Sequence, residues 1–178
     1  MACQNSHKNV VELLLKSHVN PHVQDNDGET AVYWACYYGY HAAVTTLLNS
    51  GADPNIPTNN GNTPLLAASK NGHNDVVELL LKYNVDPQAQ NKDRETAIFL
   101  ACQHGHLDVV AALLNSGADP NITTKNGGTP LMVAIENGNS DVLELLLNAD
   151  ADPNVQHALG VTAVYLSLIH ISEPTRPY

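Results

Sequence analysis

The chain has 178 residues, and its 18 acidic and 8 basic side chains give a net charge of −10 at neutral pH. The field of such an acidic chain opposes binding to nucleic acid and to anionic membrane surfaces, so we expect neither as a partner. No apolar run reaches the roughly 18 residues that a membrane-spanning helix needs, so membrane insertion is not expected. No signal peptide is visible.

One period organises almost the whole chain. Thr30, Thr63, Thr96, Thr129 and Thr162 lie 33 residues apart, and each opens a near copy of the same segment. A fixed period of roughly 20 to 50 residues is typical of a solenoid, in which each repeat packs on its neighbours. Solenoids present extended surfaces that bind other molecules. The period therefore predicts a protein that binds a partner, without identifying that partner.

Alignment on the threonines places one repeat domain at residues 1–165. Four complete units lie at 25–57, 58–90, 91–123 and 124–156, with a partial unit at 1–24 and another at 157–165. Units two apart resemble each other more closely than adjacent units do. Duplication of a two-repeat block accounts for this alternation and suggests a slice of a longer array.

Each complete unit is expected to form two short helices. The aligned threonine takes the place of an N-cap, and Pro64 and Pro130 occupy the first helical position, where a missing backbone N–H has no effect. The first helix ends at a glycine in each unit: Gly39, Gly72, Gly105 and Gly138. The second helix ends at residues that tolerate positive φ: His18, Gly51, Asn84, Gly117 and Asp150. An Asp-Pro pair then begins an extended loop.

The repeated segments resemble a known family. The complete units contain GETAVYWACYYGY, GNTPLLAASKNGH, RETAIFLACQHGH and GGTPLMVAIENGN. These segments resemble the ankyrin repeat, whose signature includes a Thr-Pro-Leu-His-x-Ala stretch, a turn and two helices. The resemblance, which extends over residues 1–165, implies an all-α repeat solenoid, a stack of helix-turn-helix pairs with projecting β-hairpin loops. It also implies a protein-interaction module.

The C-terminal segment 166–178 departs from the repeat. Residues 166–176 read LSLIHISEPTR and resemble the conceptual translation of a transposon-type sequencing-library adapter. Pro174 and Pro177 oppose a second helix there. We expect a non-native tail, with a genuine terminal tail as the alternative, and we leave this segment out of the functional reasoning. Because Met1 falls inside a repeat unit, we also expect the chain to be a fragment.

The three cysteines, Cys3, Cys36 and Cys102, share one position of the repeat, which Ser69 occupies between them. Small residues at one repeated position indicate packing. A disulfide needs Cα atoms within about 7 Å, whereas packed helices lie about 8–10 Å apart, so no bridge is expected. Unpaired cysteines favour an intracellular location. We further expect the domain to be monomeric.

No pattern in the sequence predicts a catalytic site, a cofactor or a metal site. The chain lacks Cys-x-x-Cys, His-Glu-x-x-His and a phosphate-binding glycine loop. His73 and His106 match the family's histidine at the turn between helices, where the resemblance implies that the ring holds the loop. The repeated Asp-Pro pairs indicate turn chemistry. We therefore expect no enzyme.

In the ankyrin family the hairpin tips and the exposed side of the first helix, on the concave face, usually contact the partner. Carried over by register, unit 25–57 contributes Asn26, Asp27, Glu29, Tyr37 and Tyr38. Unit 58–90 contributes Asn59, Asn60, Asn62, Lys70 and Asn71. Unit 91–123 contributes Lys92, Asp93, Glu95, Gln103 and His104. Unit 124–156 contributes Lys125, Asn126, Gly128, Glu136 and Asn137.

Two departures from the repeat concern this surface. Unit 25–57 holds five of the nine aromatic residues of the chain: Tyr33, Trp34, Tyr37, Tyr38 and Tyr40. We expect Trp34 in the core, Tyr33 half-buried, and Tyr37 and Tyr38 as exposed anchors beside Asp27 and Glu29, which favour a basic and apolar partner segment. In unit 91–123, Arg94 replaces a hairpin glycine and is strained if its φ is positive.

The loop asparagines Asn55, Asn121 and Asn154 resemble the target of the intracellular asparaginyl hydroxylase in ankyrin repeats, with a leucine upstream and an aspartate two residues before. The proline between that aspartate and the asparagine departs from the preferred Val or Ile. The alternative is that these side chains hold the loop by hydrogen bonds.

Three functions remain open from the sequence. The first is an interaction module that binds a partner protein or peptide. The second is a targeting or scaffold segment of a larger multidomain protein, such as a kinase, a ligase or a channel, in which the array positions another domain. The third is a purely structural spring in a long array.

Overall fold

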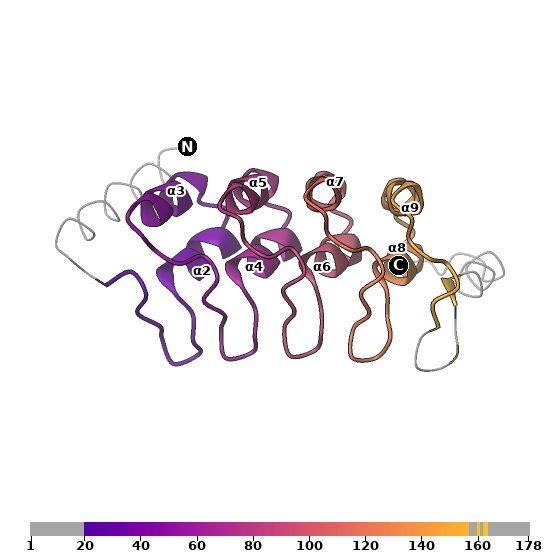
Figure 1. Cartoon of the computed structure of the whole chain (residues 1–178), viewed down its shortest axis with the longest axis horizontal. Coiled ribbons are helices and arrows are strands. Elements are labelled where there is room, and N and C mark those ends of the chain that lie inside the picture. The colour runs from indigo at the N-terminus through magenta and orange to yellow at the C-terminus, as the bar shows by residue number, and fades with distance from the viewer. Residues whose placement is uncertain (1–19, 157–159, 161, 164–178) are drawn as a thin grey trace, which may run out of the picture.

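The computed structural model describes residues 20–156, 160, 162 and 163, in which every regular element is a helix. Figure 1 shows two parallel rows of helices, with loops that project from the side of the inner row. The inner row contains α2 (Ala31–Tyr37), α4 (Pro64–Lys70), α6 (Ala97–Gln103) and α8 (Pro130–Glu136). The outer row contains α3 (His41–Asn49), α5 (Asn74–Lys82), α7 (Leu107–Asn115) and α9 (Ser140–Asn148). This arrangement confirms the predicted stack of helix pairs.

The aligned threonines cap the inner helices, as predicted. Thr30 accepts a hydrogen bond from the backbone N–H of Tyr33 at 3.1 Å, and Thr129 accepts one from that of Met132 at 3.2 Å. Thr63 and Thr96 make the same contact with the third residue of α4 and α6. All but Thr63 are at most 2 % exposed, so three of the hydroxyls satisfy helix N–H groups inside the stack.

The turn after each inner helix favours glycine because its φ is positive. In units 25–57 and 58–90 a side chain at this glycine would also clash with a histidine of the next unit. Gly39 and Gly72 have φ of +70° and +73°. A Cβ atom on Gly39 would lie 2.5 Å from Nδ1 of His73, and one on Gly72 would lie 2.6 Å from Nδ1 of His106. The histidine of the next unit thus fills the space that a side chain would need. His73 Nε2 also lies 3.0 Å from the carbonyl oxygen of Tyr37, which agrees with the loop-holding role implied for this ring.

Stacking between units supplies the core. The inner helices have seven residues and the outer helices nine, which is too short for stability in isolation. Each inner helix packs on the neighbouring inner helices and on its own outer helix. Leu80 and Leu113 on the outer helices and Ile98 on α6 are fully buried in this contact. Cys36 and Cys102 are free and buried, in agreement with a packing role; Cys3 lies outside the described residues.

Two predictions about aromatic burial were wrong. Trp34, expected in the core, is 38 % exposed, whereas its equivalents Ala67 and Leu100 are 5 % and 4 % exposed. The Trp34 indole stacks on the ring of Tyr38, with ring centroids 5.6 Å apart, and so packs in a surface cluster instead of between helices. Tyr33, expected to be half-buried, is only 8 % exposed.

Several predicted segments lie mostly or wholly outside the described residues. These are the partial units 1–24 and 157–165, the tail 166–178 and the helix end at His18.

Candidate interaction surface

The predicted contact residues lie on one side of the molecule, formed by the projecting loops and the ends of the inner helices (Figure 1). We call this side the hairpin face; it corresponds to the concave face of the sequence prediction. The loop-tip residues are all exposed: Asn26, Asp27, Asn59, Asn60, Lys92, Asp93, Lys125 and Asn126. Also exposed are Tyr37, Tyr38, Lys70, Gln103, His104, Glu136 and Asn137. The half-buried members of the set are Glu29, Asn62, Asn71, Glu95 and Gly128.

Backbone hydrogen bonds between neighbouring loops fix the spacing of these tips. The N–H of Asn59 donates to the carbonyl of Asp27 at 2.8 Å, and the N–H of Lys125 donates to that of Asp93 at 2.8 Å. The N–H of Lys92 likewise donates to the carbonyl of Asn60 at 3.0 Å. Because each loop is joined to the next, the tips form a continuous platform.

Each loop is also closed by the side chain of its first residue. Asn91 Oδ1 accepts hydrogen bonds from the N–H groups of Asp93 and Glu95 at 3.0 and 2.9 Å. Thr58 and Thr124 close their own loops through the hydroxyl oxygen. Asp25 does so with a carboxylate, and the backbone N–H of Glu29 is the main cause that holds its pKa below the usual value.

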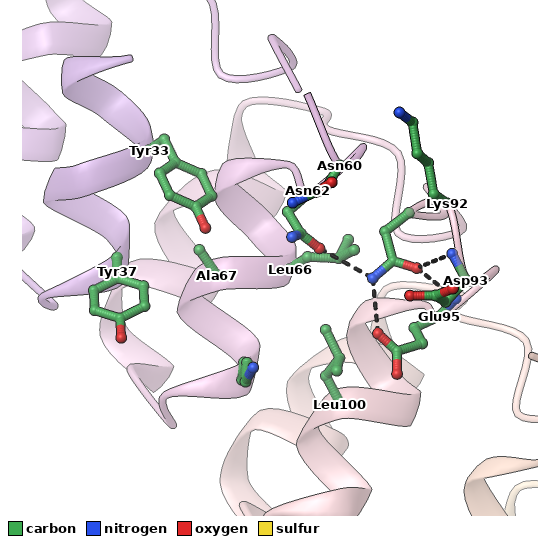
Figure 2. A pocket seen from close by; sticks show the side chains of 12 residues that line it. Tyr33, Tyr37, Asn60, Asn62, Leu66, Ala67, Lys92, Asp93, Glu95 and Leu100 are labelled. Atoms are coloured by element: carbon green, nitrogen blue, oxygen red, sulfur yellow. Dashed lines mark hydrogen bonds between the residues drawn. The ribbon is translucent and has the colours of Figure 1, made fainter. Parts of the chain in front are cut away.

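A cavity of about 340 Å³ lies on the hairpin face between α2, α4, α6 and the loops (Figure 2). Seven predicted contact residues line it: Tyr37, Asn60, Asn62, Lys70, Lys92, Asp93 and Glu95. Sequence reasoning missed Leu66, Ala67 and Leu100, which form its apolar floor, and Asn91 in its wall. The apolar residues were assigned by pattern to the core, and no signal in the sequence marks the cavity that they share.

Asn91 organises the polar wall of this cavity. Its Nδ2 donates to Asn62 Oδ1 at 3.0 Å and to Glu95 Oε2 at 2.7 Å (Figure 2). Since its Oδ1 already accepts two backbone N–H groups, the hydrogen-bonding capacity of the amide is used by the protein itself. The Glu95 carboxylate is therefore held in a defined position at the cavity before any ligand arrives.

The aromatic residues of unit 25–57 form a connected cluster beside the cavity. Tyr38 stacks on Trp34 and on Tyr40, with ring centroids 5.6 Å apart in both pairs. The edge of Tyr37 meets Tyr38 at 5.2 Å. Tyr37 is 37 % exposed and Tyr38 53 % exposed, as predicted for these two residues. Burial is the main cause that raises the pKa of Tyr33, with the Glu29 carboxylate next.

The corresponding position in unit 91–123 carries histidines instead. The rings of His104 and His106 are stacked 6.0 Å apart. Burial first, and then the charges of His106 and Lys70, lower the pKa of His104. His106 Nε2 lies 3.1 Å from the carbonyl oxygen of Lys70, which is the contact that His73 makes one unit earlier.

Arg94 has φ of +59°, in the left-handed region that its equivalents Gly28 and Gly61 adopt at +79° and +81°. The predicted condition for strain at this loop tip is therefore met. A Cβ at Gly28 would lie 2.7 Å from the backbone nitrogen of Asn59, so a side chain at position 28 would clash with the next loop.

The loop asparagines form unequal hydrogen bonds. Asn55 is exposed, and its Nδ2 donates to Asp53 in its own loop, at 3.1 Å. Asn121 is half-buried and joins two units, because its Nδ2 donates to the carbonyl of Asp150 at 3.2 Å and its Oδ1 accepts from the N–H of Asp152 at 2.7 Å. Asn154 donates to Asp152, as Asn55 does to Asp53.

Neither a metal site nor a membrane-spanning helix is found among the described residues. No group of three or more His, Cys, Asp or Glu side chains is placed to hold a metal ion there. No helix among these residues has the length and apolar character needed to cross a membrane.

The sequence of this chain matches the model of a known protein family. The family model for ankyrin repeats in three copies matches residues 1–91 and 83–157. A search of curated proteins found no match to the chain. The repeated helix pairs, the capping threonines and this match lead to the same result: the chain belongs to the ankyrin repeat family.

Proposed function

We propose that this chain is a protein-interaction module that binds a partner protein or peptide on its hairpin face, without catalysis of its own. Ankyrin repeats are in general protein–protein interaction modules and are typically non-catalytic. The observation that carries the proposal is the cavity on this face, in which side chains from three units converge over an apolar floor. Exposed tyrosines beside a fixed polar wall are typical of interface anchors.

The groove between the outer helices α5 and α7 is the competing surface. It encloses about 350 Å³ and is lined by residues that include Glu78, Lys82 and Asn115. A photo-cross-linking amino acid placed at Asn60 on the hairpin face, and in a matched variant at Lys82, separates the two. Exposure to cell extract followed by irradiation is expected to give discrete cross-linked proteins from the variant at 60. Products formed mainly from the variant at 82 would contradict the proposal.

We also propose an intracellular location and, with it, hydroxylation of the loop asparagines, in the order Asn55 before Asn121. Among the described residues the side chain of the exposed Asn55 forms a hydrogen bond within its own loop and none to another unit, whereas Asn121 must lose two hydrogen bonds between units to enter an enzyme. Peptide mass analysis after incubation with the asparaginyl hydroxylase and its cofactors tests this order, with Asn55→Ala and Asn121→Ala as matched controls. Addition of oxygen to neither residue, or first to Asn121, would refute it.

A further inference from the structure

Tyr37 and Tyr38 are exposed because of their place in the repeat. They form the last residue and the C-cap of α2, and the residues that correspond to Tyr37 in the next three units, Lys70, Gln103 and Glu136, are exposed as well. Trp34 is different, because the residues that correspond to it are buried in the other units. The identity of a partner is therefore best inferred from the two tyrosines.

These two rings are held in place before binding. Tyr38 lies between Trp34 and Tyr40 in stacked contacts with interplanar angles of 18° and 23°. Tyr37 meets Trp34 edge-on at 5.5 Å. Side chains fixed in this way lose little further entropy in a complex. The exposed part of Tyr37 suits aliphatic, aromatic and cationic groups, since the face of an aromatic ring attracts cations, whereas Tyr38, stacked on both sides, offers its exposed edge to apolar contact.

Acidic groups accompany the rings, and no lysine or arginine does so within the same unit. Unit 25–57 contains Asp25, Asp27, Glu29 and Asp53 but neither lysine nor arginine. Burial, followed by the charges of Asp25 and Asp27, raises the pKa of the Glu29 carboxyl. Among the described residues, the charges that shift this pKa, those of Asp25 and Asp27, are both negative. A cation supplied by a partner would relieve this repulsion.

The cavity beside the rings suits an apolar side chain of the partner, not its cation. Leu66, Ala67 and Leu100 offer an apolar floor, and Tyr33 and Tyr37 stand on the α2 side of the cavity (Figure 2). Lys70 and Lys92 also line the cavity, so an acidic partner segment is the competing class. In Figure 2 the Lys92 side chain extends away from Glu95 and Leu100.

We propose that Asp27, Glu29, Tyr37 and Tyr38 bind an extended partner segment that carries an arginine next to an apolar residue; this inference rests on the proposed function. The planar guanidinium stacks on an exposed tyrosine ring and donates hydrogen bonds to the carboxylates. The apolar neighbour enters the cavity and covers its floor. Arginine fits better than lysine, because its charge is delocalised over a plane that both stacks and bonds.

Selection from a library of randomised 12-residue peptides displayed on phage, with the whole chain as the target, tests this inference. Selected peptides are expected to be enriched in arginine beside aromatic or aliphatic residues. Their affinity should fall about tenfold or more in Asp27→Asn/Glu29→Gln and in Tyr37→Gln/Tyr38→His, since one ion pair or stacked cation contributes on the order of 1.4 kcal/mol. The second variant installs the residues found at the same positions of unit 91–123, Gln103 and His104.

A matched control removes the same charge elsewhere. Asp108→Asn/Glu144→Gln neutralises one aspartate and one glutamate on the outer helices α7 and α9, where both are exposed. The affinity of the selected peptides for this variant should stay within about twofold. Far-UV circular dichroism of each variant establishes that the helices are retained.

The outcomes separate this inference from the proposed function. Peptides that lack basic enrichment, that are acidic, or that bind Asp27→Asn/Glu29→Gln unchanged would overturn the inference, as would the recovery of no peptide at all. If cross-links form from position 60 in those cases, the interaction module stands and only the chemistry of its partner is wrong. If selected peptides lose affinity only for the outer-helix control, both proposals fail.

Discussion

Units 25–57 and 91–123 share the same helices, capping threonine and buried cysteine, but they expose different surfaces. Where unit 25–57 has Tyr37 and Tyr38, unit 91–123 has Gln103 and His104. The differences fall at exposed positions, whereas Thr30 and Cys36 recur as Thr96 and Cys102 in the buried core. A repeat scaffold can therefore change its binding chemistry one unit at a time, because surface positions carry little of the stacking energy.

The largest expected effect is the loss of folding stability when the turn glycines of the two units are substituted. Gly39→Ala would place a Cβ 2.5 Å from the His73 ring, whereas Gly105→Ala would place one 3.0 Å from the Asn139 amide. Both positions have positive φ, so each substitution costs about 1 kcal/mol in backbone strain. We expect the total loss for Gly39→Ala to reach about 3 kcal/mol and to exceed that for Gly105→Ala. Urea unfolding of the two variants measures this, and equal losses would count against the packing argument.

A smaller effect concerns the loop tips, where the two units differ in strain. Arg94→Gly removes a left-handed non-glycine residue, and we expect it to stabilise the fold by about 1 kcal/mol. The reciprocal change Gly28→Ala should destabilise, because a Cβ there meets the backbone of Asn59 at 2.7 Å. Thermal unfolding of both variants shows whether each substitution raises or lowers the stability of the fold. A loss of stability in Arg94→Gly would show that Arg94 makes contacts that outweigh its strain.

Unit 58–90, which lies between the two, has a serine at the position where they share a cysteine. Ser69 occupies it in unit 58–90, and its Oγ is buried without a hydrogen-bond partner. Ser69→Cys installs the residue of the flanking units, and we expect a gain of about 1 kcal/mol, because a buried hydroxyl without a partner is unfavourable. Urea unfolding under reducing conditions measures the gain. A loss of stability would mean that the larger sulfur does not fit.

The smallest expected effect depends on pH and on His104, whose counterpart in unit 25–57 is Tyr38. The folded protein lowers the pKa of this ring, first through burial and then through His106 and Lys70. The unfolded chain therefore binds the proton more readily, and folding stability falls as pH drops through the ordinary histidine value of about 6.5. We expect His104→Gln to lose less stability than the parent chain between pH 7.5 and 5.5. An identical pH dependence in both proteins would contradict this.

Much of the fold was predictable because the repeat supplies the same signal several times. The capping threonines, the turn glycines and the positive φ of Asn84 and Asp150 all follow from local backbone chemistry, and the structure agrees. The exposed state of Tyr37 and Tyr38 also followed from register. The burial of Trp34 was predicted wrongly, because its packing depends on Tyr38 and other rings rather than on its own position in the helix.

The sequence by itself determined the family, the helix ends and the acidic, aromatic character of unit 25–57, since each depends on residues near one another in the chain. The tertiary structure alone decided which side chains converge. The cavity joins residues of three units, the network of Asn91 reaches from one loop to Asn62 of the preceding unit, and Asn121 but not Asn55 bridges to the next unit. Contacts of this kind join stacked units whose equivalent residues are about 33 positions apart in the chain. Small differences in the length and rotamer of a side chain decide which residue of the next unit it bonds. No local sequence pattern encodes that choice.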